Sequence, residues 1–175
     1  MIRTPAGTTS VGGGATGAVP RSDDRAELHL IVRVGPERFA FPVAALDEVV
    51  DAPVIAWVPR AREGLLGELL HRDRTVSAYD AAWAFDVPRP PGAGTALVLR
   101  DDEARVALVV DDVDDLLLIE QGSVQPVPAG PDAAGLLRGI RFVPGDGRGL
   151  LGLVRVDALL ARVGRRGSAR SANVP

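Results

Sequence analysis

Residues 28–43 read LHLIVRVGPERFAFPV, and apolar and polar residues alternate on both sides of Gly35-Pro36-Glu37. A period of two is typical of a strand with one buried face, and the glycine-proline break predicts a tight turn. We therefore expect a β-hairpin here. Its apolar residues should meet across the turn: Leu28, Leu30, Val32, Val34, Phe39, Phe41 and Val43.

A second hairpin is predicted further on, after the strand-like segment VVDAPVIAWV (residues 49–58) and a loop centred on Pro59. Its strands are residues 68–72 and 75–79, separated by a turn at Asp73-Arg74. The stretch from Leu28 to Asp80 contains no obvious catalytic constellation. The question it raises is which surface this β-rich unit presents to a partner.

The second half of the chain repeats the order of elements in the first. A short helix is expected over residues 80–85, and the Pro/Gly-rich segment near residues 86–94 predicts a boundary between the halves. Strands 95–100 and 104–110 then flank an acidic turn. An acidic strand follows over residues 112–119, as LDEVV follows the first hairpin. This order indicates a weak internal repeat.

Two more strands, residues 136–143 and 150–156, and a short helix over 158–163 with Asp157 as its N-cap complete the predicted order. Many short strands with little helix are typical of small β-barrels. The Gly/Thr/Ala/Pro-rich residues 1–26 and the arginine-containing residues 164–175 are expected to be disordered.

The composition excludes several classes of protein. The chain has 175 residues, of which 46% are hydrophobic, and it has no cysteine, so disulfides and thiolate metal sites are ruled out. Residues 28–160 carry 13 arginines and 20 acidic residues, a formal charge of about −7 that would repel nucleic acid. No apolar run approaches the roughly 18 residues of a membrane span, and the N-terminus lacks a signal sequence. We expect a cytoplasmic protein that does not insert into membranes.

Taken in order, these segments resemble the CheW-like family of chemotaxis coupling proteins, over nearly all of residues 27–163. The resemblance lies in the order and spacing of several motifs together. They are GPERFAFPV (35–43), LDEVV (46–50), VPRA (58–61) with Gly67, LLHRDRTVSAYD (69–80), VALVVDDVDDLLLI (106–119), VQPVP (124–128) and LLRGIRFV (136–143).

The resemblance implies a mainly β fold: two intertwined five-stranded SH3-like barrels that share a hydrophobic seam, with short helices. It also implies an adaptor without catalysis, cofactor or metal. Such adaptors bind the regulatory domain of a CheA-type histidine kinase and the cytoplasmic tip of a chemoreceptor. Carried over by position, the receptor-binding residues are Leu46, Glu48, Gly67 and Arg72. An arginine fork beside an apolar groove can grip carboxylates or carbonyls, and Leu46 would supply contact area.

Three positions depart from the family pattern. Asp73 stands where the family has a turn glycine and would draw Arg72 into a local ion pair, Ser77 replaces a proline, and Arg155 replaces an aspartate. These departures leave open an alternative: a divergent CheW-like module of a non-chemotaxis pathway that binds only one partner.

A small hydrolase is a further alternative, because His71, Ser77 and Asp80 are a Ser/His/Asp grouping close in sequence. A triad needs the imidazole within hydrogen-bonding distance of both partners. On the predicted hairpin His71 lies opposite Val76, which turns Ser77 to the other face. The sequence therefore disfavours this alternative.

Other conspicuous residues have ordinary structural interpretations. The acids Asp111, Asp112, Asp114 and Asp115 lack the spacing of a calcium loop and are expected at strand ends. His29 is expected at the surface or half-buried on its strand. Trp57 and Trp83 could anchor an interface, but their apolar neighbours favour the core.

Overall fold

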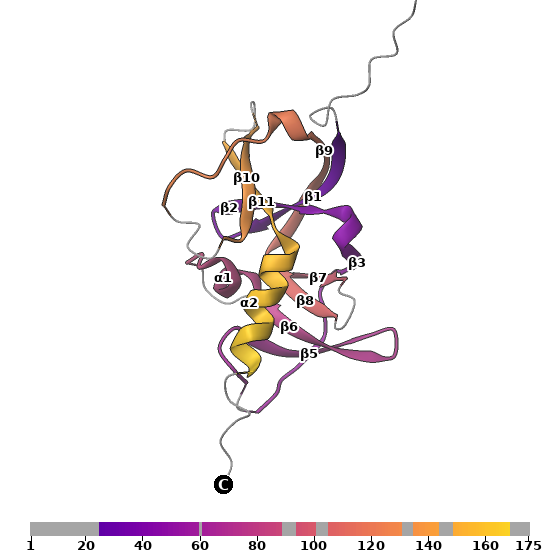
Figure 1. Ribbon diagram of the computed structural model, residues 1–175. Coiled ribbons are helices and arrows are strands. Elements are labelled where there is room, and N and C mark those ends of the chain that lie inside the picture. The colour runs from indigo at the N-terminus through magenta and orange to yellow at the C-terminus, as the bar shows by residue number, and fades with distance from the viewer. Residues whose placement is uncertain are drawn as a thin grey trace, which may run out of the picture.

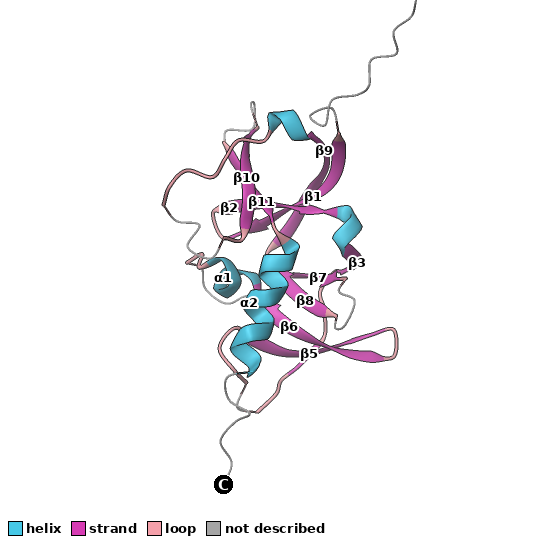
Figure 2. Cartoon of the chain, in the orientation of Figure 1, coloured by secondary structure: helices cyan, strands magenta, loops and turns pink. Residues whose placement is uncertain are grey.

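The computed structural model describes residues 25–59, 61–88, 94–100, 105–130, 135–143 and 149–168. The fold is mainly β, with two groups of strands one above the other and a few short helices (Figures 1 and 2). Most of the tails that were expected to be disordered, residues 1–24 and 169–175, lies outside the described residues.

The described part of the first half runs from β1 to α1. Its elements are β1 (Ala26–Val34), β2 (Glu37–Pro42), the 3-10 turn η2 (Val43–Ala45), β3 (Leu46–Val50), β4 (Ile55–Ala56), β5 (Leu65–His71), β6 (Arg74–Asp80) and α1 (Ala81–Phe85). The second half runs from β7 to α2. Its elements are β7 (Thr95–Leu99), β8 (Val106–Val110), β9 (Asp112–Glu120), η3 (Gln121–Ser123), β10 (Leu137–Phe142), β11 (Leu150–Val154) and α2 (Val156–Ser168).

Both predicted hairpins are present. In the first, Leu30 pairs with Phe41 and Val32 with Phe39 across the turn. In the second, the predicted turn is wrong by one residue: Arg72 and Asp73 form it, with φ angles of 43° and 61°. Two-residue hairpin turns with positive φ at both positions match the twist of the flanking strands. His71 therefore pairs with Arg74, and Leu69 instead of His71 lies opposite Val76.

The strands form two sheets, which we call the first and second barrels. The first barrel has the order β10-β11-β2-β1-β9, and the second has the order β3-β7-β8-β6-β5-β4. The second barrel thus has six strands where five were expected, because the two-residue β4 pairs with β5 through Ile55↔Leu69 and Ala56↔Glu68.

The two halves of the sequence exchange strands between the barrels. After the β1–β2 hairpin, the acidic strand β3 crosses to the second barrel and pairs with β7. After the β7–β8 hairpin, the acidic strand β9 crosses to the first barrel and pairs with β1. The internal repeat is therefore real, and the segment near residues 86–94 lies between its two units. Strands from both sides of this segment share each sheet, so the two halves of the sequence do not correspond to two separate barrels.

Three apolar clusters hold this arrangement. One fills the first barrel around Ile31, and another fills the second barrel around Val98. The third, the inter-barrel seam, lies between them and includes Val32, Phe41 and Leu97. Successive residues of β7 point alternately into the seam and into the second barrel, so all five are buried. Strands buried on both faces explain the continuous apolar runs in the sequence.

Each half ends in a helix that closes one side of the seam. Asp80 caps α1 by accepting a hydrogen bond of 3.0 Å from the Ala82 backbone N–H, and the Phe85 ring stacks on Phe39 at 4.2 Å. Helix α2 buries Leu159 and Val163 in the seam. It extends to Ser168, beyond the predicted end of the helix at residue 163.

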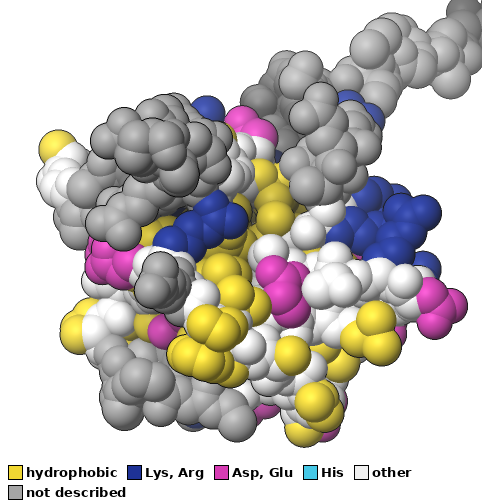
Figure 3. All heavy atoms as spheres, turned by 90° about the horizontal axis from the view of Figure 1, so that it is seen from below, with side chains coloured by type: hydrophobic (Ala, Val, Ile, Leu, Met, Phe, Trp, Pro, Cys, Tyr) yellow, Lys and Arg dark blue, Asp and Glu magenta, His cyan; other side chains and the backbone are white. Residues whose placement is uncertain are grey.

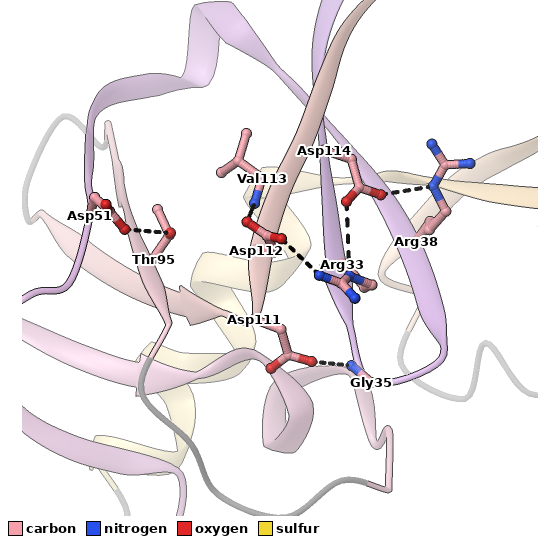
Figure 4. A network of polar contacts seen from close by, with 9 residues as sticks. All are labelled: Arg33, Gly35, Arg38, Asp51, Thr95, Asp111, Asp112, Val113 and Asp114. Carbon is pink, nitrogen blue, oxygen red and sulfur yellow. Dashed lines mark hydrogen bonds and ion pairs between the residues drawn. The ribbon is translucent and has the colours of Figure 1, made fainter.

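The acidic residues before and within β9 connect that strand to the first hairpin (Figure 4). Asp111 accepts a 2.6 Å hydrogen bond from the Gly35 backbone N–H. Asp112 pairs with Arg33 at 2.8 Å, and Asp114 pairs with Arg38 at 3.2 Å. Within the described residues no group of His, Cys, Asp or Glu is arranged to hold a metal ion. These acids fasten the exchanged strand to its new neighbour.

His29 is fully buried, which corrects the expectation of a surface or half-buried residue. Its side chain shares a strand face with Ile31, which points into the first barrel. Arg138 approaches His29 Nε2 at 2.8 Å, and because a guanidinium can only donate, Nε2 accepts and Nδ1 donates to the Glu27 carbonyl at 2.8 Å. Burial lowers the pKa of His29 from its ordinary value of 6.5, and Arg138 adds to the effect, against opposing contributions from Glu27.

Replacing Phe41 by alanine should lower the free energy of unfolding by about 3–5 kcal/mol, because the ring is fully buried in the seam between both barrels. Phe142→Ala is the matched control, since that ring is exposed, and it should change stability by less than about 1 kcal/mol. Urea denaturation of both variants tests this. Equal losses would contradict the assignment of the seam as the main core.

The lowered pKa of His29 predicts a pH-dependent stability. As pH falls below 6.5, the unfolded chain takes up a proton that the folded chain does not, so stability is lost until pH reaches the folded-state pKa. The slope is at most about 1.4 kcal/mol per pH unit for one proton. Unfolding free energies measured from pH 8 to pH 5 should fall more steeply for the wild type than for His29→Gln. Parallel profiles would show that His29 does not titrate in this way.

Candidate functional site

The structure brings together two of the four predicted receptor-binding residues. Glu48 lies on β3 and Arg72 in the β5–β6 turn, and Arg72 Nη2 is 3.2 Å from Glu48 Oε2. Their side chains are 41% and 59% exposed. The pair is thus an ion pair at the surface, with both charged groups accessible to a partner.

The position of this pair follows from the edges of the second barrel. Strand β3 is one edge of the sheet, and β4, the other edge strand, pairs with β5 only as far as Leu69. The end of β5 and the turn after it therefore have no backbone partner in β4, and their side chains contact those of β3 instead. The β5–β6 hairpin projects to one side of the molecule (Figure 1). The residues that meet there, which we call the edge cluster, are Asp47, Glu48, His71, Arg72, Arg100 and Arg105.

His71 lies at the centre of the edge cluster, and its side chain is only 3% exposed. Its Nε2 is 3.4 Å from Asp47 Oδ2, and its Nδ1 is 3.4 Å from Glu48 Oε2. One imidazole thus faces both carboxylates of β3, from the opposite edge of the sheet.

Asp47 is the most heavily paired member of the cluster. Arg105 Nη2 lies 3.3 Å from Asp47 Oδ2, while Arg100 and Arg72 lie 3.9 Å from Oδ1. Desolvation raises the pKa of Asp47, but Arg105, His71, Arg72 and Arg100 together outweigh it and lower the pKa below its ordinary value of 3.8. The ionised carboxylate therefore stabilises the fold at neutral pH, and that contribution is lost only as pH falls below 3.8 toward the lowered pKa.

The other two predicted residues support the site from within. Leu46 is buried in the inter-barrel seam, so its side chain offers little area to a partner and instead fixes the start of β3. Gly67 lies where β4 approaches β5: a Cβ there would be 2.2 Å from the Ala56 carbonyl oxygen. Any larger residue at position 67 would push β4 away.

The residues proposed for a hydrolase do not come together. His71 faces Asp47 and Glu48, Ser77 donates a 3.0 Å hydrogen bond to Glu68 Oε1, and Asp80 caps α1. The register places Ser77 opposite Glu68, on the other face of the hairpin from Leu69 and His71. This geometry does not form a Ser/His/Asp triad.

The departure at Asp73 has a different effect from the one expected. Within the described residues, Arg72 pairs with Asp47 and Glu48 and not with Asp73. Asp73 instead adopts a left-handed backbone conformation in the turn, which aspartate tolerates better than most residues. Arg72 therefore remains directed toward β3.

The two tryptophans lie in different environments. Trp83 packs on Tyr79 and Gly64, and the Arg162 guanidinium lies 5.9 Å above its ring. Trp57 is 74% exposed, so its predicted place in the core is wrong. Val54, just before β4, and Leu70, on β5, are exposed as well.

Figure 3, which views the molecule from below, shows apolar side chains and separate groups of arginine on the same face. Exposed aromatic and aliphatic side chains of this size are available to a partner.

Comparison with known protein families gives a direct result. The family model described as "CheW-like domain" matches residues 28–164. The chain belongs to the CheW-like domain family. Among solved structures, this CheW-like chain is similar to the scaffolding protein TtCheW from Thermoanaerobacter tengcongensis. The TM-score is 0.66 at 17% sequence identity, and the match covers 75% of this chain and 90% of the other, which shows a shared fold. No curated protein matches the sequence.

The fold expected from the CheW-like resemblance is thereby confirmed, with the strand exchange seen above as its physical basis. In the part of the chain that the structure describes, no helix is long and apolar enough to cross a membrane.

The contrast between the tryptophans predicts unequal effects of substitution. Trp83→Ala should destabilise the protein by about 3 kcal/mol, because it empties the space between Tyr79 and Gly64. Trp57→Ala should change stability by less than about 1 kcal/mol, because the ring is exposed. Thermal denaturation of the two variants side by side measures this. A large loss for Trp57→Ala would place that ring against the core after all.

Proposed function

We propose that this chain is a chemotaxis adaptor that couples chemoreceptors to a CheA-type histidine kinase. In this proposal it binds the regulatory domain of the kinase and the cytoplasmic tip of a receptor at the same time, and it catalyses no reaction itself. Family membership over residues 28–164 supports the general role. The observation that carries the receptor side is the exposed Glu48–Arg72 pair at the open edge of the second barrel.

This pair suits recognition of another protein. Arg72 can grip a carboxylate or a backbone carbonyl with its fork of N–H groups, and Glu48 can accept from a donor beside it. The two charges lie on different elements, β3 and the β5–β6 turn, and the barrel behind them is held by the buried His71 and by Asp47, whose side chain is 11% exposed. A partner therefore meets charges of opposite sign at a defined spacing, which favours selectivity over raw affinity.

Coupling in such an adaptor is a matter of linkage. If the receptor tip and the kinase domain bind different surfaces of one body, a receptor state that binds more tightly also changes the kinase's binding free energy, and the reverse holds equally. The inter-barrel seam makes the two barrels one packed unit, so strain at one surface is transmitted to the other. This role places the protein in the cytoplasm, where receptor tips and kinase meet.

A second candidate function is a CheW-like module of a non-chemotaxis pathway that binds only one partner. The observation in its favour is Ser77, which stands where the family has a proline and is engaged by Glu68 within the β5–β6 hairpin. A surface whose polar groups are satisfied internally has fewer to offer a partner. Binding of the kinase domain without binding of any receptor tip would support this candidate.

Replacing Arg72 by alanine should weaken binding of a chemoreceptor cytoplasmic fragment from the same organism by about tenfold or more, as expected for loss of an arginine anchor. Stability should change by less than about 1 kcal/mol, because the side chain is 59% exposed. Isothermal titration calorimetry against the receptor fragment and the kinase regulatory domain measures both affinities.

Arg74→Ala is the matched control, because Arg74 is an exposed arginine at the start of the strand that follows the same turn. It should leave receptor binding nearly unchanged. If the two substitutions weaken receptor binding equally, Arg72 contributes only through its positive charge and makes no specific contact. A large loss of stability in Arg72→Ala with unchanged binding would show that Arg72 is structural.

A further inference from the structure

We propose that His71 is a positioning residue of the partner-binding surface: its buried imidazole fixes the place of the Glu48 carboxylate, and through it Arg72, without touching the partner. This inference rests on the proposed function, since it assigns a role in receptor binding. His71 is not among the receptor-binding residues that the family resemblance implies. Its buried side chain would determine how the exposed side chains of Glu48 and Arg72 are arranged.

The geometry separates His71 from any partner. Its side chain is 3% exposed, whereas Glu48 and Arg72, which it supports, are 41% and 59% exposed. The same oxygen, Glu48 Oε2, lies 3.4 Å from His71 Nδ1 and 3.2 Å from Arg72 Nη2. The imidazole thus holds the carboxylate from the inside, and the guanidinium holds it from the outside.

Glu48 and Arg72 need such support because both side chains are long and flexible. An exposed ion pair between them loses much of its strength to solvent and to the entropy of ordering two side chains. A buried ring with only two rotatable bonds, placed at the end of β5, loses less entropy, and it donates to both carboxylates when each ring nitrogen carries a proton. With the carboxylate fixed, Arg72 is presented to a partner in one arrangement.

The charges that face the imidazole come from each neighbouring element. Asp47 and Glu48 approach its two nitrogens from β3, and Arg72 follows it in the turn. Arg105 and Arg100, on either side of the β7–β8 connection, approach the Asp47 carboxylate behind it. Asp47 is therefore locked in place and anchors Nε2, which leaves Nδ1 aimed at Glu48. The Nε2 contact closes the barrel edge, and the Nδ1 contact orients the binding surface.

The two contacts can be separated by substitution. The amide nitrogen of asparagine lies close to the position of the histidine Nδ1, and that of glutamine lies close to Nε2. His71→Asn thus keeps a donor toward Glu48, His71→Gln keeps one toward Asp47, and His71→Leu keeps neither. Binding of each variant to the chemoreceptor cytoplasmic fragment, with thermal stability measured in parallel, tests the role of each nitrogen.

We expect His71→Asn to bind the receptor fragment within about threefold of wild type, and His71→Gln and His71→Leu to bind about tenfold or more weakly. In a Glu48→Ala background, His71→Gln should cause no further loss, because the group it positions is gone. Affinity for the kinase regulatory domain should not follow this order, which controls for global damage.

Three results would overturn the inference. Unchanged receptor binding in all three variants would show that Glu48 needs no support. Losses of binding that follow losses of stability, with asparagine and glutamine equal, would give His71 a purely structural role. If the losses of binding free energy in His71→Gln and Glu48→Ala add fully in the double variant, His71 acts independently of Glu48.

If the variants do not fold, the wild-type protein still provides a test. The nitrogen-15 chemical shift of His71 Nδ1 in the wild-type protein should differ from that in Glu48→Ala, which leaves the ring in place, and identical shifts would overturn the inference. Failure of the proposed function is distinguishable from all of these outcomes, because in that case the wild-type chain itself does not bind the receptor fragment.

Discussion

The apolar seam between the two barrels is the feature on which the rest of this structure depends. Strands β1, β7 and β8 are buried on both faces, one against the seam and the other inside a barrel. Each half of the sequence passes its acidic third strand to the other barrel, where β3 meets β7 and β9 meets β1. Neither barrel is therefore complete from one half of the chain. The ion pairs of Asp112 and Asp114 with the first hairpin fasten one of these exchanges at the surface.

The same architecture leaves the second barrel with an open edge, and the candidate site lies at this edge. Strand β4 is too short to cover the end of β5, so the sheet is bridged there by the edge cluster instead of by backbone hydrogen bonds. Buried His71 and the largely covered Asp47 hold the two edges together, while exposed Glu48 and Arg72 face outward. A position where side chains replace a backbone ladder can be altered without loss of the fold, which makes it a suitable place for recognition to evolve.

The sequence predicts those parts of the structure that depend on local pattern. The alternation in residues 28–43 and the turn at Gly35 predict the first hairpin. The second turn is misplaced by one residue because Arg72-Asp73 and Asp73-Arg74 look equally suitable, and only strand pairing decides between them. Trp57 and His29 are misassigned because apolar neighbours do not reveal which face a residue occupies. Glu48 and Arg72 were predicted as site residues from the family resemblance. The contacts of His71, Arg100 and Arg105 join residues far apart in sequence, and no local sequence pattern indicates them.

The most direct test of the coupling role is autophosphorylation of the CheA-type kinase, reconstituted with chemoreceptor-containing membranes from the same organism, with and without this chain. We expect kinase activity to respond to receptor ligand only when the chain is present, because the chain must bind both proteins for the coupling to exist. A kinase that responds to receptor equally well without the chain, or that never responds although the chain binds it, would contradict the account. The second of these results would identify a CheW-like fold that has kept one partner and lost the other.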